Sequence, residues 1–147
     1  RKWFDNKVPS NETISTENKL ENYAKIAVEN FIHKFDMYKL DLAANEVLSL
    51  AINTNLYLND NQPWMLIKDK NNLPLVKEII YNVLESTRII GLLLLPLLPE
   101  LSSKINEQLG SIYREEISWK QQLKWGLLNS NSSLPKPTPI INKLEYE

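Results

Sequence analysis

The stretch that decides the fold is LPLVKEIIYNVLESTRIIGLLLLPLLP, residues 73–99. Pro74 suits the first turn of a helix, where the amide that proline lacks has no partner to lose. The residues of one side then recur at intervals of three and four, at Val76, Ile79, Ile80, Val83, Leu84, Thr87, Ile90 and Gly91. Towards Leu95 the pattern becomes apolar on every side, which is typical of a central helix in a bundle. Pro96 and Pro99 end this helix.

The first hundred residues contain two more helical patterns. Ser15 or Thr16 can cap a helix, and its apolar stripe consists of Leu20, Tyr23, Ala24, Ala27, Val28, Phe31 and Phe35. A second helix is predicted from about Lys39 to Leu58, with apolar positions Leu42, Ala43, Val47, Leu50 and Ala51.

Pro63 interrupts the second pattern, because proline lacks an amide and disfavours a helical conformation in the residue before it. We expect a short helical turn over residues 63–68 and a polar loop over residues 69–72. The stripes also predict the core, since they have only one another to pack against. The residues expected to be largely buried are Phe31, Val47, Leu84, Ile90 and Leu94.

The remainder of the chain contains one more short helix, over residues 100–109, closed by Gly110. Residues 111–147 include Trp119, Trp125 and three closely spaced prolines, so we expect an extended tail that packs back on the helices. No internal repeat or long linker divides the chain. The sequence therefore predicts a single domain over residues 1–147, an all-α helical bundle of about four to five helices with an extended C-terminal tail.

The composition excludes several classes of protein. The 147 residues include no cysteine and three glycines, which excludes a disulfide scaffold, a thiolate zinc site and a glycine-rich phosphate loop. With 17 basic and 18 acidic residues the net charge is −1, whereas a protein that wraps nucleic acid by charge alone carries a basic excess. The most apolar run, residues 89–98, is half the ~20 residues that a membrane-spanning helix needs. We therefore expect no membrane segment and a cytoplasmic protein.

No constellation of residues in the sequence supports catalysis. His33 is the only histidine, and it lies four residues after Glu29 on one face of the first predicted helix. Such a pair can begin a metal site, but a third ligand at a recognisable spacing is missing, so a surface ion pair is the preferred interpretation. The sequence predicts no catalytic residue, no metal ligand and no cofactor site in this chain.

Residues 53–68, NTNLYLNDNQPWMLIK, are the most informative stretch for function. A proline beside Trp64 at a helix end can hold the indole as a rigid plate, and the neighbouring asparagine amides donate and accept hydrogen bonds. Single-stranded RNA is read in this way, by stacking of its bases on aromatic rings and by hydrogen bonds to base edges. A tryptophan beside a proline is equally typical of a core plug under a loop. The residues alone leave both interpretations open.

The same stretch resembles the signature of a known family. Asn55 and Tyr57, followed by Pro63, Trp64 and Lys68, are similar to the N-x-Y and P-W-x-x-x-K pattern in the C-terminal anticodon-binding domain of methionyl-tRNA synthetase.

Four other segments resemble that domain, in the same order along the chain. Residues 4–9 are similar to its aromatic-x-G-x-V-P loop, with Asn6 where glycine is usual. Residues 85–99 resemble its L-R-I helix end with L-x-P-x-x-P, and residues 104–110 resemble its K-I-x-x-x-L-G segment. Residues 125–144 resemble its ending, a W-G step followed by P-x-P. Together these matches cover almost the whole chain.

The resemblance implies a role and a set of residues. In this family the tryptophan of the P-W step stacks on an anticodon base of the methionine tRNA, so Trp64 is the expected RNA contact and Pro63 shapes its support. Asn55, Tyr57 and Asn61 are the further candidates for RNA binding. The expected partners are the anticodon loop of the methionine tRNA and the catalytic domain of the same polypeptide.

The resemblance also implies what lies outside this stretch. The asparagine and arginine with which the family reads the anticodon stand on a helix before the aromatic-x-G-x-V-P loop, so a chain that opens at Arg1 is expected to lack the first helix of the domain. ATP and magnesium, with zinc as an open alternative, are implied for the parent enzyme, which joins methionine to its tRNA. This stretch alone is expected to be non-catalytic.

Other interpretations stay open at this point. Anticodon domains of other class I synthetases share the helical plan, and some share the P-W step. A helical protein–protein interaction module would use Trp3, Trp119 and Trp125 as interface anchors. An enzyme with a carboxylate site would need a constellation that the sequence does not show.

Overall fold

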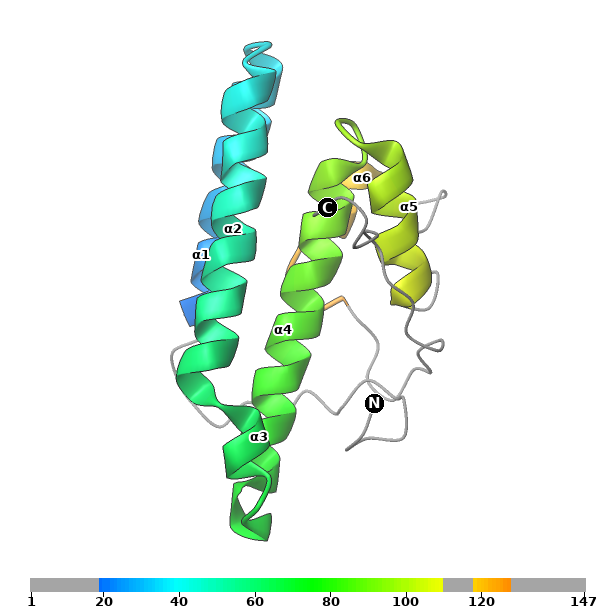
Figure 1. Ribbon diagram of the computed structural model, residues 1–147. Helices are drawn as coiled ribbons and strands as arrows, with labels where there is room; N and C mark the ends of the chain where they lie inside the picture. The colour runs from blue at the N-terminus through cyan, green and yellow to red at the C-terminus, as the bar shows by residue number, and fades with distance from the viewer. Residues whose placement is uncertain (1–18, 110–117, 128–147) are drawn as a thin grey trace, which may run out of the picture.

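The computed structural model describes residues 19–109 and 118–127, and every regular element in these residues is helical. The elements are α1 (Lys19–Asp36), α2 (Leu40–Asn61), α3 (Pro63–Leu66), the 3-10 helix η1 (Lys70–Asn72), α4 (Leu73–Leu94), α5 (Pro99–Gln108) and α6 (Trp119–Gln122). The helices α1 and α2 form an antiparallel pair, α4 runs beside α2, and α5 folds back along α4 (Figure 1). The predicted all-α bundle is confirmed.

The turn between α1 and α2 closes without a glycine. Lys39 N donates to Lys34 O at 2.9 Å, and Tyr38 N donates to Phe35 O at 3.0 Å, which are the two hydrogen bonds of a Schellman motif. Tyr38 occupies the left-handed position of that motif, with a φ of 61°, where glycine is usual. Across the two helices, Lys34 Nζ pairs with Glu46 Oε1 at 2.5 Å. The turn therefore fixes α2 antiparallel to α1.

The main core forms where α1, α2 and α4 meet. Its buried members are Ala24, Ala27, Phe31, Ala43, Val47, Leu50, Ile89, Leu92, Leu93 and Leu123. The predicted burial of Phe31 and Val47 is thus confirmed. Tyr23 and Leu42, which the sequence places on the apolar stripes, are instead 44% and 38% exposed. Both lie at the edge of a stripe, about 100° of helical rotation from the alanine that follows each of them.

The buried face of the central helix α4 overlaps the predicted stripe only in part, at Val76, Ile79 and Gly91. Its buried residues are Val76, Glu78, Ile79, Tyr81, Asn82, Glu85, Ser86, Arg88, Ile89, Gly91, Leu92 and Leu93. Leu84, Ile90 and Leu94 are partly buried, and Ile90 and Leu94 pack against the main core, so their predicted burial is confirmed in part. A helix that is apolar on nearly every side has no face that periodicity can select. The buried polar residues of α4 determine which face is buried. Ser86 and Asn82 form hydrogen bonds with α2, and Arg88 donates to backbone carbonyls at the end of α6 and after it.

One end of the bundle is built where the second helical pattern breaks, as Pro63 predicts. Gln62 adopts a left-handed conformation with φ 45° and ψ 62°, and α3 starts at the proline after it. The predicted polar loop contains η1, which is capped by Asp69, whose carboxylate accepts a hydrogen bond from Asn71 N at 2.9 Å. Residues 62–72, with the last turns of α2 and the first turns of α4 that adjoin them, are called the α3–η1 end below, and they lie at the lower end of the molecule in Figure 1.

The helices α5 and α6 pack on the other half of α4. Ser102 Oγ donates to Gly91 O at 2.5 Å, and Trp119 Nε1 donates to Leu92 O at 2.6 Å. The short helix predicted over residues 100–109 is confirmed as α5. Of the predicted tail, residues 118–127 contain the single turn of α6.

The remaining predictions about the chain ends fall on residues outside the described part. These are the helix caps Ser15 and Thr16, the closing residue Gly110, and the tail beyond residue 127. Within the described part, no helix is both long enough and apolar enough to span a bilayer.

Candidate nucleic-acid interface

Trp64 lies in the single turn of α3, with 43% of its surface exposed. Its neighbour Pro63 is fully buried. Met65 N and Leu66 N both donate to Gln62 O, at 2.9 and 3.2 Å, so the backbone on both sides of the indole is fixed. A half-exposed ring on a fixed backbone fits a stacking plate better than a core plug.

Tyr57 connects the last turns of α2 to α4. Asn82 Nδ2 donates to the Tyr57 hydroxyl at 3.0 Å. Burial raises the pKa of Tyr57; the hydrogen bond from Asn82 opposes the rise and the carboxylate of Glu78 adds to it. The hydroxyl therefore stays protonated at neutral pH. Since the ring is half-buried, its main contribution is to hold the end of α2 in place.

The asparagines of this region differ in what they can offer to RNA. Asn61 Nδ2 donates to Tyr57 O at 2.7 Å, inside the last turn of α2. Asn72 Nδ2 donates to Leu66 O at 3.3 Å, which ties η1 to α3. Asn55 is exposed, and it lies about 9 Å along the helix axis from Asn61. Of the predicted set, Tyr57, Asn61, Pro63 and Trp64 are therefore brought together at one end, and Asn55 lies further along α2.

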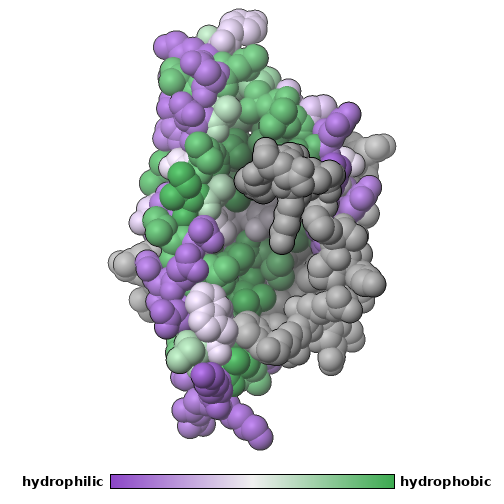
Figure 2. Space-filling model, in the orientation of Figure 1, coloured by the Kyte–Doolittle hydropathy of each residue, from purple (hydrophilic) through white to green (hydrophobic). Residues whose placement is uncertain are grey.

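The surface changes character towards this end of the molecule. Figure 2 shows hydrophilic side chains over the α3–η1 end, whereas apolar side chains gather in the region between α2 and α4. A partner that contacts Trp64 therefore meets an exposed aromatic ring, the exposed apolar side chains of Met65 and Leu73, and the hydrophilic side chains of the same end.

The structure also contains a buried ionic group that the sequence analysis missed. Glu85 has no exposed surface. It pairs with Arg88 one turn further along α4, where Arg88 Nη2 donates to Glu85 Oε2 at 3.1 Å. The same carboxylate accepts hydrogen bonds from two backbone amides after α6, those of Gly126 and of Leu127 at 2.7 Å. Every charge that α4 buries here is therefore compensated.

Arg88 completes the connection on the other side. Its Nη1 donates to Gln122 O at 2.5 Å, and its Nη2 donates to Lys124 O at 2.6 Å. We call Glu85 and Arg88, with the backbone of residues 122–127, the clamp. A sequence signal for it exists: a Glu and an Arg three residues apart in a largely apolar helix indicate a buried pair, because unpaired charges are almost never buried.

The described part of the chain shows no metal-binding arrangement. No group of three or more His, Asp or Glu side chains in it could hold a metal ion. The ion pairs in this part are Lys25–Glu21, Lys34–Glu46 and Arg88–Glu85. The predicted pair of His33 with Glu29 is not formed among these residues; both side chains are exposed, where solvation competes with such a contact.

Comparison with known proteins places this geometry in a family. Residues 8–147 match the family model of the anticodon binding domain of methionyl tRNA ligase. The chain belongs to this family. It is 31% identical over 145 residues to the methionine–tRNA ligase of Nostoc sp., and 29% identical over 149 residues to that of Caldanaerobacter subterraneus. The alignments include 92% and 99% of this chain but 26% and 23% of the relatives. The chain thus spans about a quarter of the length of these methionine–tRNA ligases.

Solved structures support the fold of this anticodon-binding family member. The free form of Mycobacterium tuberculosis methionyl-tRNA synthetase matches with a TM-score of 0.76 and 23% identity, over 95% of this chain and 28% of that one. The same protein bound by methionyl-adenylate matches with a TM-score of 0.75. At this identity the likeness concerns the fold alone. The resemblance found in the sequence motifs is confirmed by the family match.

Proposed function

We propose that this chain is the part of a longer methionyl-tRNA ligase that binds the anticodon loop of the methionine tRNA. The half-exposed Trp64 on its fixed backbone carries the proposal, because a ring held in this way can stack on an unpaired base without first being ordered. The family match supports the anticodon-binding role, and the hydrophilic side chains of the α3–η1 end are compatible with RNA.

The five candidate residues have different parts in this proposal. Trp64 stacks on a base, and the exposed amide of Asn55 is available to a base edge or a ribose. The other three candidates hold the site in place without contacting RNA. Pro63 is buried, and Tyr57 and Asn61 form hydrogen bonds at the end of α2.

The rest of the proposal concerns the longer enzyme. It joins methionine to its tRNA in the cytoplasm with the use of ATP and magnesium, and zinc stays an open alternative. We place these cofactors in the remainder of the polypeptide. We further propose that residues 1–147 form one domain whose first helix, with the other anticodon-reading residues, is contributed by that remainder.

The test compares two tryptophans in the full-length synthetase. Trp64→Ala should weaken binding of an anticodon stem-loop with the sequence CAU by roughly 1–3 kcal/mol, the contribution of one base–aromatic stack. The melting temperature should hardly change, because the ring is half-exposed. The matched control is Trp119→Ala, which removes a ring that packs against Phe31 and donates to Leu92 O. This control should lower the melting temperature and leave the affinity of the folded enzyme unchanged.

Two results would contradict the proposal. The first is an unchanged affinity for the stem-loop in Trp64→Ala. The second is a large fall in its melting temperature with normal charging of the tRNA, which would mean that Trp64 is a core residue after all.

A further inference from the structure

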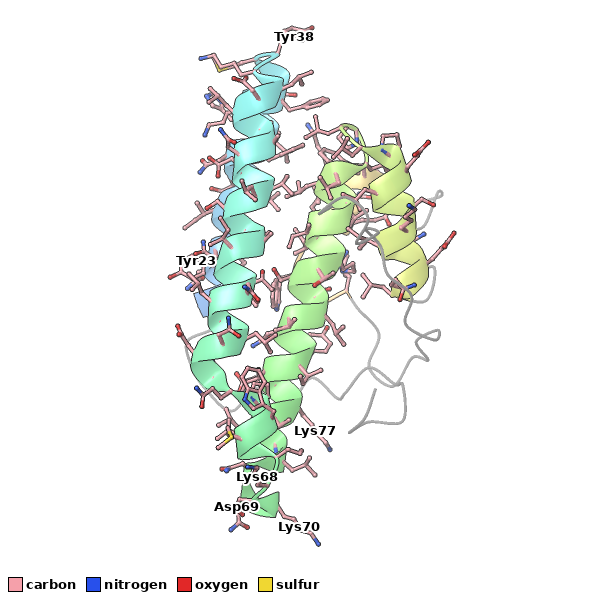
Figure 3. The ribbon with its side chains drawn as sticks, in the orientation of Figure 1. Tyr23, Tyr38, Lys68, Asp69, Lys70 and Lys77 are labelled. Atoms are coloured by element: carbon pink, nitrogen blue, oxygen red, sulfur yellow. The ribbon has the colours of Figure 1, made fainter. Side chains whose placement is uncertain are left out.

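Three lysines gather at the α3–η1 end, and none of them has an ion-pair partner among the described residues. Lys68 follows α3, Lys70 opens η1, and Lys77 lies near the start of α4. Figure 3 places all three, together with Asp69, at the same end of the bundle. The ion pairs of the described part lie elsewhere, within α1, between α1 and α2, and within α4 at the clamp.

Two of the carboxylates near this end interact with groups other than the lysines. Asp69 accepts a hydrogen bond from Asn71 N as the cap of η1. Glu78 is buried, and its charge acts on the Tyr57 hydroxyl between α2 and α4. Asp69 is itself exposed, and the next exposed acid in sequence is Asp60, on the last turn of α2. The first turn of α4 contains no acidic residue.

This distribution matters because the chain as a whole has a net charge of −1 and cannot attract RNA by its total charge. Lys68 and Lys70 are exposed, and Lys77 is half-buried, which lets its apolar stem pack while the ammonium group reaches water. Single-stranded RNA sites combine an aromatic plate with cations that follow the backbone. The lysines supply such cations at the end of the bundle that also contains Trp64.

We propose that Lys70 and Lys77 bind phosphate groups of the RNA strand whose base stacks on Trp64. The inference rests on the proposed function. Lys68 belongs to the P-W-x-x-x-K pattern that carried the family resemblance, so the new assignment concerns the other two lysines. In Figure 3 both extend from the α4 side of this end. Contacts to phosphate position a strand without reading its sequence, so these lysines set the register of the loop on the plate.

The salt dependence of binding tests this assignment. The double variant Lys70→Gln/Lys77→Gln of the full-length synthetase is titrated with a fluorescent CAU anticodon stem-loop at several KCl concentrations. Each lost phosphate contact makes the plot of log affinity against log salt shallower by about 0.7 for a single strand. We expect a reduction of the slope by about 1.4, with the same loss of affinity for a stem-loop of altered anticodon.

Two controls separate local contact from general charge and from stacking. Lys39→Gln/Lys104→Gln removes the same charge from exposed sites on the α1–α2 turn and on α5, and its slope should equal that of the wild type. Trp64→Ala should weaken binding with an unchanged slope. Melting temperatures of all variants are measured in parallel.

The outcomes are distinguishable. An unchanged slope in Lys70→Gln/Lys77→Gln, with weakened binding in Trp64→Ala, overturns the phosphate assignment and leaves the proposed function standing. Equal slope reductions in the variant and in the Lys39/Lys104 control overturn it as well, since only net charge would then matter. If neither Trp64→Ala nor the lysine variant changes binding, this end of the molecule does not bind RNA, and the proposed function fails with the phosphate assignment.

Discussion

The two ends of α4 stabilise the chain in different ways, and two tryptophans make the contrast clear. At the clamp end, Trp119 packs against Phe31 with ring centroids 6.0 Å apart and donates its indole N–H to Leu92 O. At the α3–η1 end, the backbone around Trp64 is fixed by hydrogen bonds to Gln62 O while its ring stays half-exposed. Trp119 therefore contributes to the stability of the fold, whereas Trp64 is held in an exposed position by the backbone around it. The contacts of the indole ring itself thus distinguish a structural tryptophan from one that is available to a partner.

The largest expected effect is at the clamp. Glu85→Ala leaves Arg88 buried without its carboxylate and two backbone amides without an acceptor, which should reduce the free energy of unfolding by about 3–5 kcal/mol. Chemical denaturation measures the loss. Binding of the stem-loop by the folded fraction should be normal. A loss below about 1 kcal/mol would mean that water replaces the carboxylate, and the two ends would then differ less than we infer.

The next largest effect is expected at alkaline pH, where ionisation of Tyr81, one turn before Glu85 on α4, should reduce the free energy of unfolding. Burial raises the pKa of Tyr81 to about 12; the nearby Glu85 carboxylate adds to the rise and Arg88 opposes it. The folded protein thus keeps this hydroxyl neutral while the unfolded chain ionises it near pH 10. Stability from this group is complete below pH 10 and is lost as the pH rises to 12, by on the order of 2 kcal/mol.

Thermal unfolding between pH 9 and pH 12 checks this prediction, with Tyr81→Phe as the reference protein. The variant has no hydroxyl to ionise, so its melting temperature should fall less over the same interval. Parallel curves for the two proteins would assign the alkaline loss to other groups.

A smaller effect is expected from Tyr57→Phe at the α3–η1 end. The change keeps the ring but removes the hydroxyl that accepts a hydrogen bond from Asn82, so the free energy of unfolding should fall by about 0.5–1.5 kcal/mol. If Tyr57 supports the site from behind, the affinity for the stem-loop changes little once the protein is folded. A large loss of affinity at unchanged stability would instead mean that the hydroxyl itself contacts RNA.

The smallest effect concerns the α1–α2 turn, which belongs to neither end. Tyr38 is 90% exposed and holds a left-handed conformation, so Tyr38→Gly removes strain at the cost of a more flexible unfolded chain. We expect a net stabilisation of about 0.5–1 kcal/mol with unchanged RNA binding. Denaturation and stem-loop titration both apply, and a destabilised variant would show that the exposed ring makes contacts that its exposure does not suggest.

Prolines made much of the fold predictable. Pro63 and Pro74 bracket the α3–η1 end, and Pro96 and Pro99 separate α4 from α5, so the order of the helices follows from sequence. The face that α4 turns inward does not. Its second half is apolar on most sides, and the choice depends on Glu85 and Arg88 meeting backbone groups some forty residues further along the chain. Periodicity within one helix contains no information about such distant partners.

The candidate site was predictable to a similar degree. The exposed ring at Trp64 follows from a tryptophan beside a helix-breaking proline, once a family resemblance favours the plate over the plug. The inward roles of Tyr57 and Asn61 do not follow, because an asparagine near a helix end is equally suited to RNA and to the carbonyl four residues before it. That Lys70 and Lys77 have no ion-pair partner in the described part of the chain depends on the positions of Asp69 and Glu78, which only the three-dimensional arrangement decides.

Gly126 has a further consequence for how this chain can vary. Its φ of 95° lies in the region that L-amino acids avoid, yet a β-carbon built there meets no atom within 4 Å. The constraint at this position is therefore the positive φ and not a lack of space for a side chain. Bulk is therefore a poor guide to tolerance: asparagine, larger than alanine, should fit better because it accepts left-handed backbone more readily. The last turn of the clamp therefore accepts residues according to how well they tolerate a positive φ, and not according to their size.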